Sequence, residues 1–231
     1  MKKYRFTLIE FMVVLAIIAI LASLLLPSLA RSRYIANGTV CLSQQRQQVQ
    51  VYTSYAVDNK SQLPPHSPQI GGNIWQGPES VYNDWGNPTG IGLCRDQGYS
   101  IPIEFLFCPV NSDPNWGPDG PKGWDFEQNK LKSQWLRTSY YYRATKNRHE
   151  NGNNGRMLKL TDSGASSVTA DHFSNNHPWT HNKYKPGFNV AYLDGSASLF
   201  QTSVIHSQVT TNAFHGYDEM EVYGWMTFDE K

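Results

Sequence analysis

Three histidines and three aspartates lie close together in the C-terminal third of this 231-residue chain. They are His172, His177, His181, Asp162, Asp171 and Asp194. Imidazole and carboxylate groups together suit zinc or manganese, so a metal site is the first chemistry to consider. However, their spacings match no compact metal motif, and residues 173–180 are predicted to form a loop. We therefore interpret the six as surface and turn residues and expect no metal site.

Motifs for catalysis and for common ligands are absent from the sequence. It has no G-x-S-x-G nucleophile elbow, no H-E-x-x-H zinc motif and no phosphate-binding P-loop. Residues 111–122 begin like a calcium-binding loop, but Trp116 stands where an EF-hand needs glycine and Lys122 where it needs glutamate. We expect that the protein is not an enzyme.

The composition favours an anchored or exported protein with many loops. Hydrophobic residues make up 39% of the chain and charged residues 17%, but much of the hydrophobicity is concentrated in the first thirty residues. The formal net charge of +1 gives no electrostatic basis for binding nucleic acid. Aromatic residues, at 13%, can build a core with few aliphatic side chains.

The first thirty residues contain one long apolar segment with a single acidic residue. From Phe6 to Leu26 every residue except Glu10 is uncharged, and about 20 apolar residues are enough to cross a bilayer. Three basic residues precede the segment and two follow it closely. This distribution favours a cytoplasmic N-terminus by the positive-inside rule.

Three interpretations of this segment are open. It can be a simple signal anchor, but then Glu10 has a cost in the bilayer and no explanation. It can be a secretory signal peptide, cleaved at the small-x-small site Ser28-Leu29-Ala30. The third interpretation accounts for Glu10 and rests on a resemblance.

The run Arg5-Phe6-Thr7-Leu8-Ile9-Glu10, with the apolar segment after it, resembles the N-terminus of type IV prepilins and type II secretion pseudopilins. In that family a basic leader is cut before a residue that is usually phenylalanine, the new N-terminus is methylated, and the fifth mature residue is glutamate. The resemblance implies that Phe6 is the first mature residue. Arg5 is a departure, because the family usually has glycine before the cut.

The resemblance also implies roles for Glu10 and Pro27. A carboxylate in a stack of helices can meet the N-terminal amine of a neighbouring subunit, and a displaced subunit would leave two charges unpaired. Glu10 is therefore expected to set the register between subunits. Pro27 falls where many pilins carry proline and is expected to kink the helix, because proline lacks a main-chain N–H.

Beyond Pro27, apolar residues recur at helical steps as far as Ala56. We predict a nearly continuous helix from about Phe6 to about Val57, with polar residues between Arg31 and Gln48 on its other face. The segment Leu63-Pro64-Pro65 ends the helical region.

A narrower resemblance covers most of the chain. Segments around Cys41, Leu63-Pro64-Pro65 and Cys108 are similar to a bacterial pilin-like subgroup that carries a C-terminal motif described as H-X9-DG. Here twelve residues separate His181 from Asp194 and Gly195, so the motif is H-X12-DG, which we interpret as a three-residue insertion. These three motif residues are expected to act in folding of the head or in assembly.

The expected fold is α+β: a long kinked N-terminal helix with a small antiparallel β-sheet head and long loops. Asp-Gly at 194–195 predicts a hairpin between extended runs at 189–193 and 196–200, and Val168–Asp171 is predicted to be another strand. We divide the chain into four parts. They are a leader (1–5), a transmembrane half of the helix (6–28), a head-packing half (29–62) and the loop-rich head (63–231).

Three cysteines permit one disulfide, and from the residues alone all three pairings remain open, as does plain burial. Cys41 and Cys108 stand at family-like positions, whereas Cys94 stands where the subgroup commonly has an aliphatic residue. With an extracytoplasmic head, the resemblance favours a Cys41–Cys108 bridge.

The resemblance implies a pilin-like or pseudopilin subunit of a type II secretion or type IV pilus-type filament. Its expected partners are other pilin or pseudopilin subunits, the prepilin peptidase/methyltransferase and an inner-membrane assembly platform, with no nucleic acid. We expect a single-pass protein of the bacterial inner membrane, with a cytoplasmic N-terminus and an extracytoplasmic head. No cofactor is expected, although calcium stays open because some pseudopilins hold it in head loops.

An alternative is a membrane-anchored extracytoplasmic module that never polymerises. Five tryptophans crowd the middle of the chain, at positions 75, 85, 116, 124 and 135. Aromatic side chains in loops can stack on sugars, so this module would bind glycan. They can equally form a small core beneath long loops.

Overall fold

The structure, a computed structural model of the chain, describes most of the N-terminal helix and the sheet of the head. The described residues are 7–65, 81, 88–99, 101–109, 124–125, 130–131, 138–143, 145–146, 156–162, 164, 166–171, 187–201 and 228–229. The chain divides into two units, Met1–Asn37 and Gly38–Lys231, and each is described by itself.

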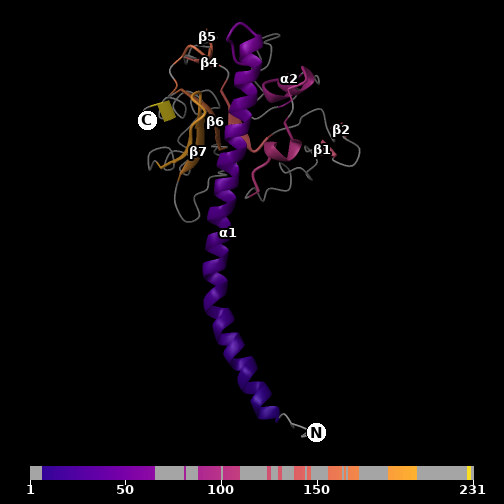
Figure 1. The fold of residues 1–231 in the computed structure, drawn as a ribbon, viewed down its shortest axis with the longest axis vertical. Coiled ribbons are helices and arrows are strands. Elements are labelled where there is room, and N and C mark those ends of the chain that lie inside the picture. The colour runs from indigo at the N-terminus through magenta and orange to yellow at the C-terminus, as the bar shows by residue number, and fades with distance from the viewer. Residues whose placement is uncertain are drawn as a thin grey trace, which may run out of the picture. The chain divides into compact units, whose positions relative to one another are not determined.

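One long helix, α1, spans Leu8–Asp58 and belongs to both units (Figure 1). This confirms the predicted long helix to within two residues at either end. The helix continues through Pro27 without a break, and a kink there stays a prediction. After Asp58 the chain turns with positive φ at Lys60 and Ser61. The main-chain N–H of Ser61 donates to the Ala56 carbonyl (2.8 Å), which satisfies one acceptor at the helix end.

The head contains a four-stranded antiparallel sheet in the order β3-β6-β7-β8. Its strands are β3 (Tyr140–Tyr142), β6 (Ser167–Asp171), β7 (Phe188–Tyr192) and β8 (Ala197–Phe200). The predicted extended runs correspond to β6, β7 and β8, so these predictions are confirmed, and the α+β fold with them. Two short hairpins complete the described strands: β1 (Trp124–Asp125) with β2 (Lys130–Leu131), and β4 (Thr145–Lys146) with β5 (Arg156–Met157).

Within the head, α1 runs between this sheet and a segment that carries two short helices (Figure 1). These are α2 (Ile91–Asp96) and the 3-10 helix η1 (Ile103–Leu106), which the sequence did not indicate. Val49, Tyr52 and Ala56 of α1 are buried in the main core cluster with Leu106 and Tyr142. The second half of α1 is therefore the centre of the head.

Both faces of the sheet are covered. On the inner face, Tyr142 stacks on Tyr52 of α1 with ring centroids 4.2 Å apart. The outer-face side chains form a second cluster with Phe228. Its members are Tyr141, Ala170, Phe188, Val190, Tyr192 and Phe228, with Phe200 beside them. Successive residues of a strand point to opposite faces, so every residue of β6 and β7 is buried.

The predicted Asp-Gly hairpin joins β7 to β8. The N–H of Gly195 donates to the Tyr192 carbonyl (2.9 Å), and the N–H of Tyr192 donates to the Ser196 carbonyl (2.8 Å). Gly195 has φ of 80°, a left-handed conformation that glycine adopts without a steric cost. Asp194 accepts a hydrogen bond from the Ser196 N–H through Oδ1 (2.8 Å), which closes an Asx-turn.

Candidate functional site

In the first unit, as far as the structure describes it, α1 exposes its large hydrophobic side chains. Among the described residues, the exposed large hydrophobic side chains all lie on α1, and all except Val57 lie between Leu8 and Val40. Each such side chain would gain about 1.5–3 kcal/mol from full burial. This part of α1 is long and apolar enough to cross a membrane. Exposed apolar patches of this extent mark surfaces that contact lipid or another protein.

Glu10 lies in the first turn of α1 and is held by Thr7. Its Oε2 accepts hydrogen bonds from the main-chain N–H of Thr7 (2.8 Å) and from the Thr7 hydroxyl (2.7 Å). The Thr7 Oγ1 in turn accepts from the N–H of Glu10 (3.3 Å). This reciprocal pattern is a capping box. The capping box was not predicted from the sequence, although Thr-x-x-Glu at the start of an apolar run is its usual signal.

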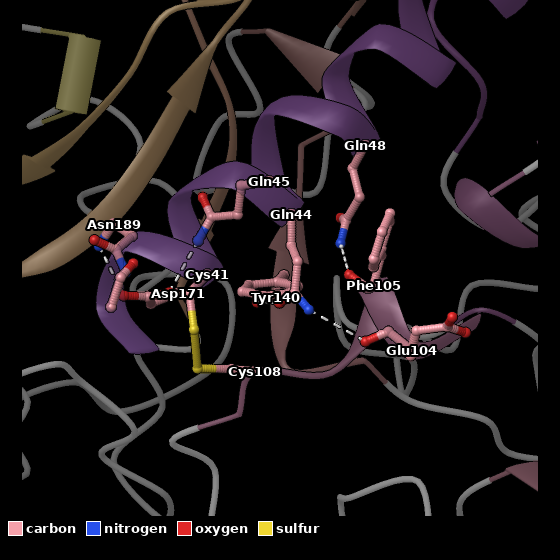
Figure 2. The surroundings of a disulfide bond; sticks show 11 residues. Cys41, Gln44, Gln45, Gln48, Glu104, Phe105, Cys108, Tyr140, Asp171 and Asn189 are labelled. Carbon is pink, nitrogen blue, oxygen red and sulfur yellow. Dashed lines mark hydrogen bonds between the residues drawn. A yellow bond between two sulfur atoms is a disulfide. The ribbon is translucent and has the colours of Figure 1, made fainter. Parts of the chain in front are cut away.

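The head half of α1 buries three glutamines, Gln44, Gln45 and Gln48. Gln44 donates to the carbonyl of Glu104 (3.3 Å) and Gln48 to that of Phe105 (2.9 Å), which ties η1 to the helix (Figure 2). Each buried amide has a partner, as the cost of burying a bare amide demands. The sequence pattern places these glutamines on the polar face of the helix, but in the structure they are buried in the head.

Gln45 joins α1 to the sheet through a buried carboxyl group. Its Nε2 donates to Asp171 Oδ1 (2.9 Å), and the N–H of Asn189 donates to Asp171 Oδ2 (2.7 Å). Asp171 is 2% exposed. Burial raises the pKa of Asp171 well above its usual value, and the hydrogen bonds from Asn189 and Gln45 offset only part of that effect. One carboxyl group thus links α1, β6 and β7 (Figure 2).

We expect the head to lose stability as pH rises, because of Asp171. Its pKa is raised in the folded head, so between about pH 4 and that raised pKa the folded head holds a proton that the unfolded chain has released. This stabilisation is complete below about pH 4 and is lost as the pH rises through the raised pKa, by at most about 1.4 kcal/mol per pH unit. Unfolding in detergent from pH 4 to 9, compared with Asp171→Asn, measures it. Parallel pH profiles for the two chains would contradict the assignment.

Cys41 and Cys108 form a disulfide with their Cα atoms 5.5 Å apart (Figure 2). The bridge connects α1 to the segment just after η1, beside the Gln44 and Gln48 bonds. Cys94 of α2 is a free, buried thiol, and burial raises its pKa to about 12. It stays protonated at neutral pH and packs as an apolar residue.

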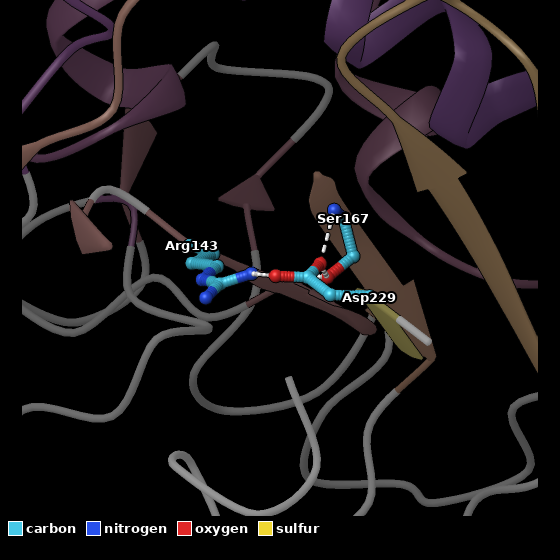
Figure 3. Close-up of polar contacts among 3 residues, drawn as sticks. All are labelled: Arg143, Ser167 and Asp229. Carbon is cyan, nitrogen blue, oxygen red and sulfur yellow. Dashed lines mark hydrogen bonds and ion pairs between the residues drawn. The ribbon is translucent and has the colours of Figure 1, made fainter. Parts of the chain in front are cut away.

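The C-terminal Phe228 and Asp229 close the outer face of the sheet. Phe228 is buried and its ring meets those of Phe188 and Phe200 at 5.9 and 5.4 Å between centroids. Asp229 pairs with the buried Arg143 (2.7 Å) and accepts from the N–H and hydroxyl of Ser167 (2.8 and 2.7 Å), as Figure 3 shows. The β6–β7 register shifts between Ser167 and Thr169. Asp229 accepts its hydrogen bonds from Ser167, at this irregular end of β6.

Several residues singled out in the sequence lie outside the described residues. They are Arg5 and Phe6 of the cleavage motif, His172, His177 and His181, the loop 111–122, and Trp75, Trp85, Trp116 and Trp135. Within the described residues, no group of His, Cys, Asp or Glu could hold a metal ion. Asp162 accepts from the N–H of Lys159 (2.9 Å), so like Asp171 and Asp194 it bonds the main chain.

A long helix with an exposed apolar first part, followed by a small antiparallel sheet, is the arrangement of a pilin-like fold. The chain is 34% identical over 95 residues to the type IV wide pilus major component PilA4 of Thermus thermophilus. That match covers 41% of this chain and 72% of the relative. The chain therefore belongs to the type IV pilin family. No protein-family model and no solved structure matches it.

Proposed function

We propose that this chain is a subunit of a type IV pilus-type filament, held in the membrane by residues 6–28 before it assembles. The observation that carries the proposal is the exposed apolar part of α1, in which Glu10 is the one acidic residue between Thr7 and Val40. The relative PilA4 is a pilus component, which favours a pilus over a secretion filament. Helix packing between copies would bury the apolar side chains that the single chain exposes.

The proposed location is the bacterial inner membrane, with the head outside the cytoplasm. The basic residues Lys2, Lys3 and Arg5 precede the span, as is usual on the cytoplasmic side. The Cys41–Cys108 disulfide supports an oxidising compartment for the head, since cytosolic thiols are kept reduced. In this proposal residues 29–62 are the head-packing half of the helix, and residues 63–231 form the head.

Assembly in this proposal depends on the processed N-terminus. A prepilin peptidase/methyltransferase cuts the chain between Arg5 and Phe6, which removes residues 1–5. It then methylates the amine of Phe6, and this amine stays cationic. An inner-membrane platform then brings the subunit to the growing filament, where this amine meets the Glu10 carboxylate of a neighbouring copy. Two opposite charges in an apolar surrounding are tolerated only as a pair, so the pair sets the axial register.

Mass spectrometry of the N-terminus of the protein from its native cell tests this proposal. The expected product begins at N-methylated Phe6. A chain that begins at Arg31 would show ordinary secretion, and a chain that retains Met1–Arg5 would show a permanent anchor. Either result would overturn the filament proposal, because neither chain would carry a free amine at Phe6.

A further inference from the structure

Two arginines, Arg31 and Arg33, stand directly after the apolar part of α1. Residues 11–30 carry no formal charge, and both arginines are exposed in the single chain. Positions two apart on an α-helix point to nearly opposite sides of it and differ in height by only about 3 Å. The two guanidinium groups therefore form a positive ring around α1, here called the arginine collar, at the level where the uncharged run ends.

The distance between the collar and Glu10 matches the thickness of a bilayer. Both lie on one continuous helix, Leu8–Asp58, which rises about 31 Å from Glu10 to Arg31 at about 1.5 Å per residue. The hydrocarbon core of a bilayer is about 30 Å thick. With the collar at the phosphates of one leaflet, the Glu10 carboxylate reaches the opposite edge of the hydrocarbon, where water and headgroups reduce the cost of its charge.

We infer that the arginine collar binds the phosphate groups of anionic phospholipids in the extracytoplasmic leaflet and so sets the depth of α1 before assembly. The inference rests on the proposed function, which holds α1 in a membrane with the head outside the cytoplasm. A guanidinium group offers a planar fork of N–H donors that matches two phosphate oxygens. Leu29 and Ile35, on either side of the collar in the sequence, are 50% and 56% exposed, so apolar contacts keep it at the lipid surface.

The charge around the collar complements a lipid phosphate. The acidic residues of α1 are Glu10 and Asp58, close to its two ends, so the stretch of helix between them carries positive charge only. A basic residue close to an anionic membrane surface is attracted to it strongly enough to change local binding roughly fivefold. The collar should therefore gather anionic lipid around α1 at this one level.

Photo-crosslinking to lipid tests the inference, with the whole chain reconstituted in phosphatidylcholine vesicles. The probe is a trace of phosphatidylglycerol with a photoreactive headgroup, and peptide mass spectrometry locates the crosslinks. We expect them around residues 29–36, and each replacement, Arg31→Gln or Arg33→Gln, should lower their yield there roughly fivefold. Arg31→Lys/Arg33→Lys keeps both charges and should retain most of the yield.

Arg46→Gln is the matched control, because it removes one positive charge from α1 within the head, where Arg46 donates to the Ala197 carbonyl (3.0 Å). It should leave the yield at residues 29–36 unchanged. A native yield in Arg31→Gln/Arg33→Gln, or an equal loss in Arg46→Gln, would overturn the inference and leave the proposed function standing. A native chain that fails to float with the vesicles would overturn the proposed function itself, and the inference with it, so the two failures are distinguishable.

A second lipid probe measures the depth of α1. Phosphatidylcholine with a photoreactive group at the end of its acyl chain reacts at the bilayer centre, which falls near Ile20 when residues 11–30 cross the hydrocarbon. Without the collar, the basic residues ahead of the span hold α1 from the cytoplasmic side only. In the double glutamine variant the crosslinks should therefore move about one turn, toward Leu24. Crosslinks that stay centred on Ile20 in this variant would show that the collar does not set the depth.

Discussion

Replacing Glu10 by glutamine is expected to prevent incorporation of this pilin into filaments while leaving its amount in the membrane unchanged. The neutral amide cannot neutralise the Phe6 amine of a neighbouring copy. An unpaired buried charge costs about 3–5 kcal/mol, which corresponds to a loss of roughly 10²–10⁴-fold in association. Insertion is spared because the variant segment is less costly in lipid than the native one. Sheared filaments and membrane fractions measure the two quantities separately.

Glu104→Gln is the matched control, since η1 contributes its main-chain carbonyl, not its carboxylate, to Gln44. That variant should assemble as the native chain does. A Glu10→Gln chain still carries its own Phe6 amine, which can pair with Glu10 of a native copy. In mixed expression the variant should therefore enter filaments together with native copies. Filaments of Glu10→Gln alone at the native level would show that another contact sets the register.

Removing the Cys41–Cys108 disulfide should destabilise the head by about 4 kcal/mol. The bridge closes a loop with a sequence separation of 67 residues, and the loop-closure entropy of such a loop in the unfolded chain gives about that value. The bridge also holds the segment after η1 beside α1, next to the hydrogen bonds that Gln44 and Gln48 donate to η1. Chemical unfolding of Cys41→Ala/Cys108→Ala in detergent measures the loss. Alanine is preferred to serine because Cys41 is fully buried.

Cys94→Ala is the control for the disulfide, because Cys94 is buried but unbridged. It removes one sulfur from the core, and its smaller loss reports cavity formation alone. A reductant should lower the stability of the native chain and of Cys94→Ala, but not that of the double variant. An equal effect of reductant on all three chains would contradict the assigned role of the bridge.

The sequence by itself determined the elements whose signals are local. The apolar segment with Glu10 and the helical steps up to Ala56 predict α1, because neighbours on a helix surface are three or four residues apart. Asp194-Gly195 predicts its hairpin, since the required left-handed conformation belongs to one residue, Gly195. The capping box of Thr7 and Glu10 is equally local and was open to prediction.

The tertiary structure decided which remote residues meet. Three cysteines allowed three pairings, and only the fold places Cys41 beside Cys108. The glutamines of α1 are polar by type, but their burial depends on carbonyl and carboxyl partners from η1 and β6. Phe228 and Asp229 belong to no local sequence pattern. In the structure, Phe228 covers the outer face of the sheet and Asp229 pairs with Arg143. Such contacts join residues from about thirty to more than a hundred positions apart, and chain folding, not residue type or spacing, brings them together.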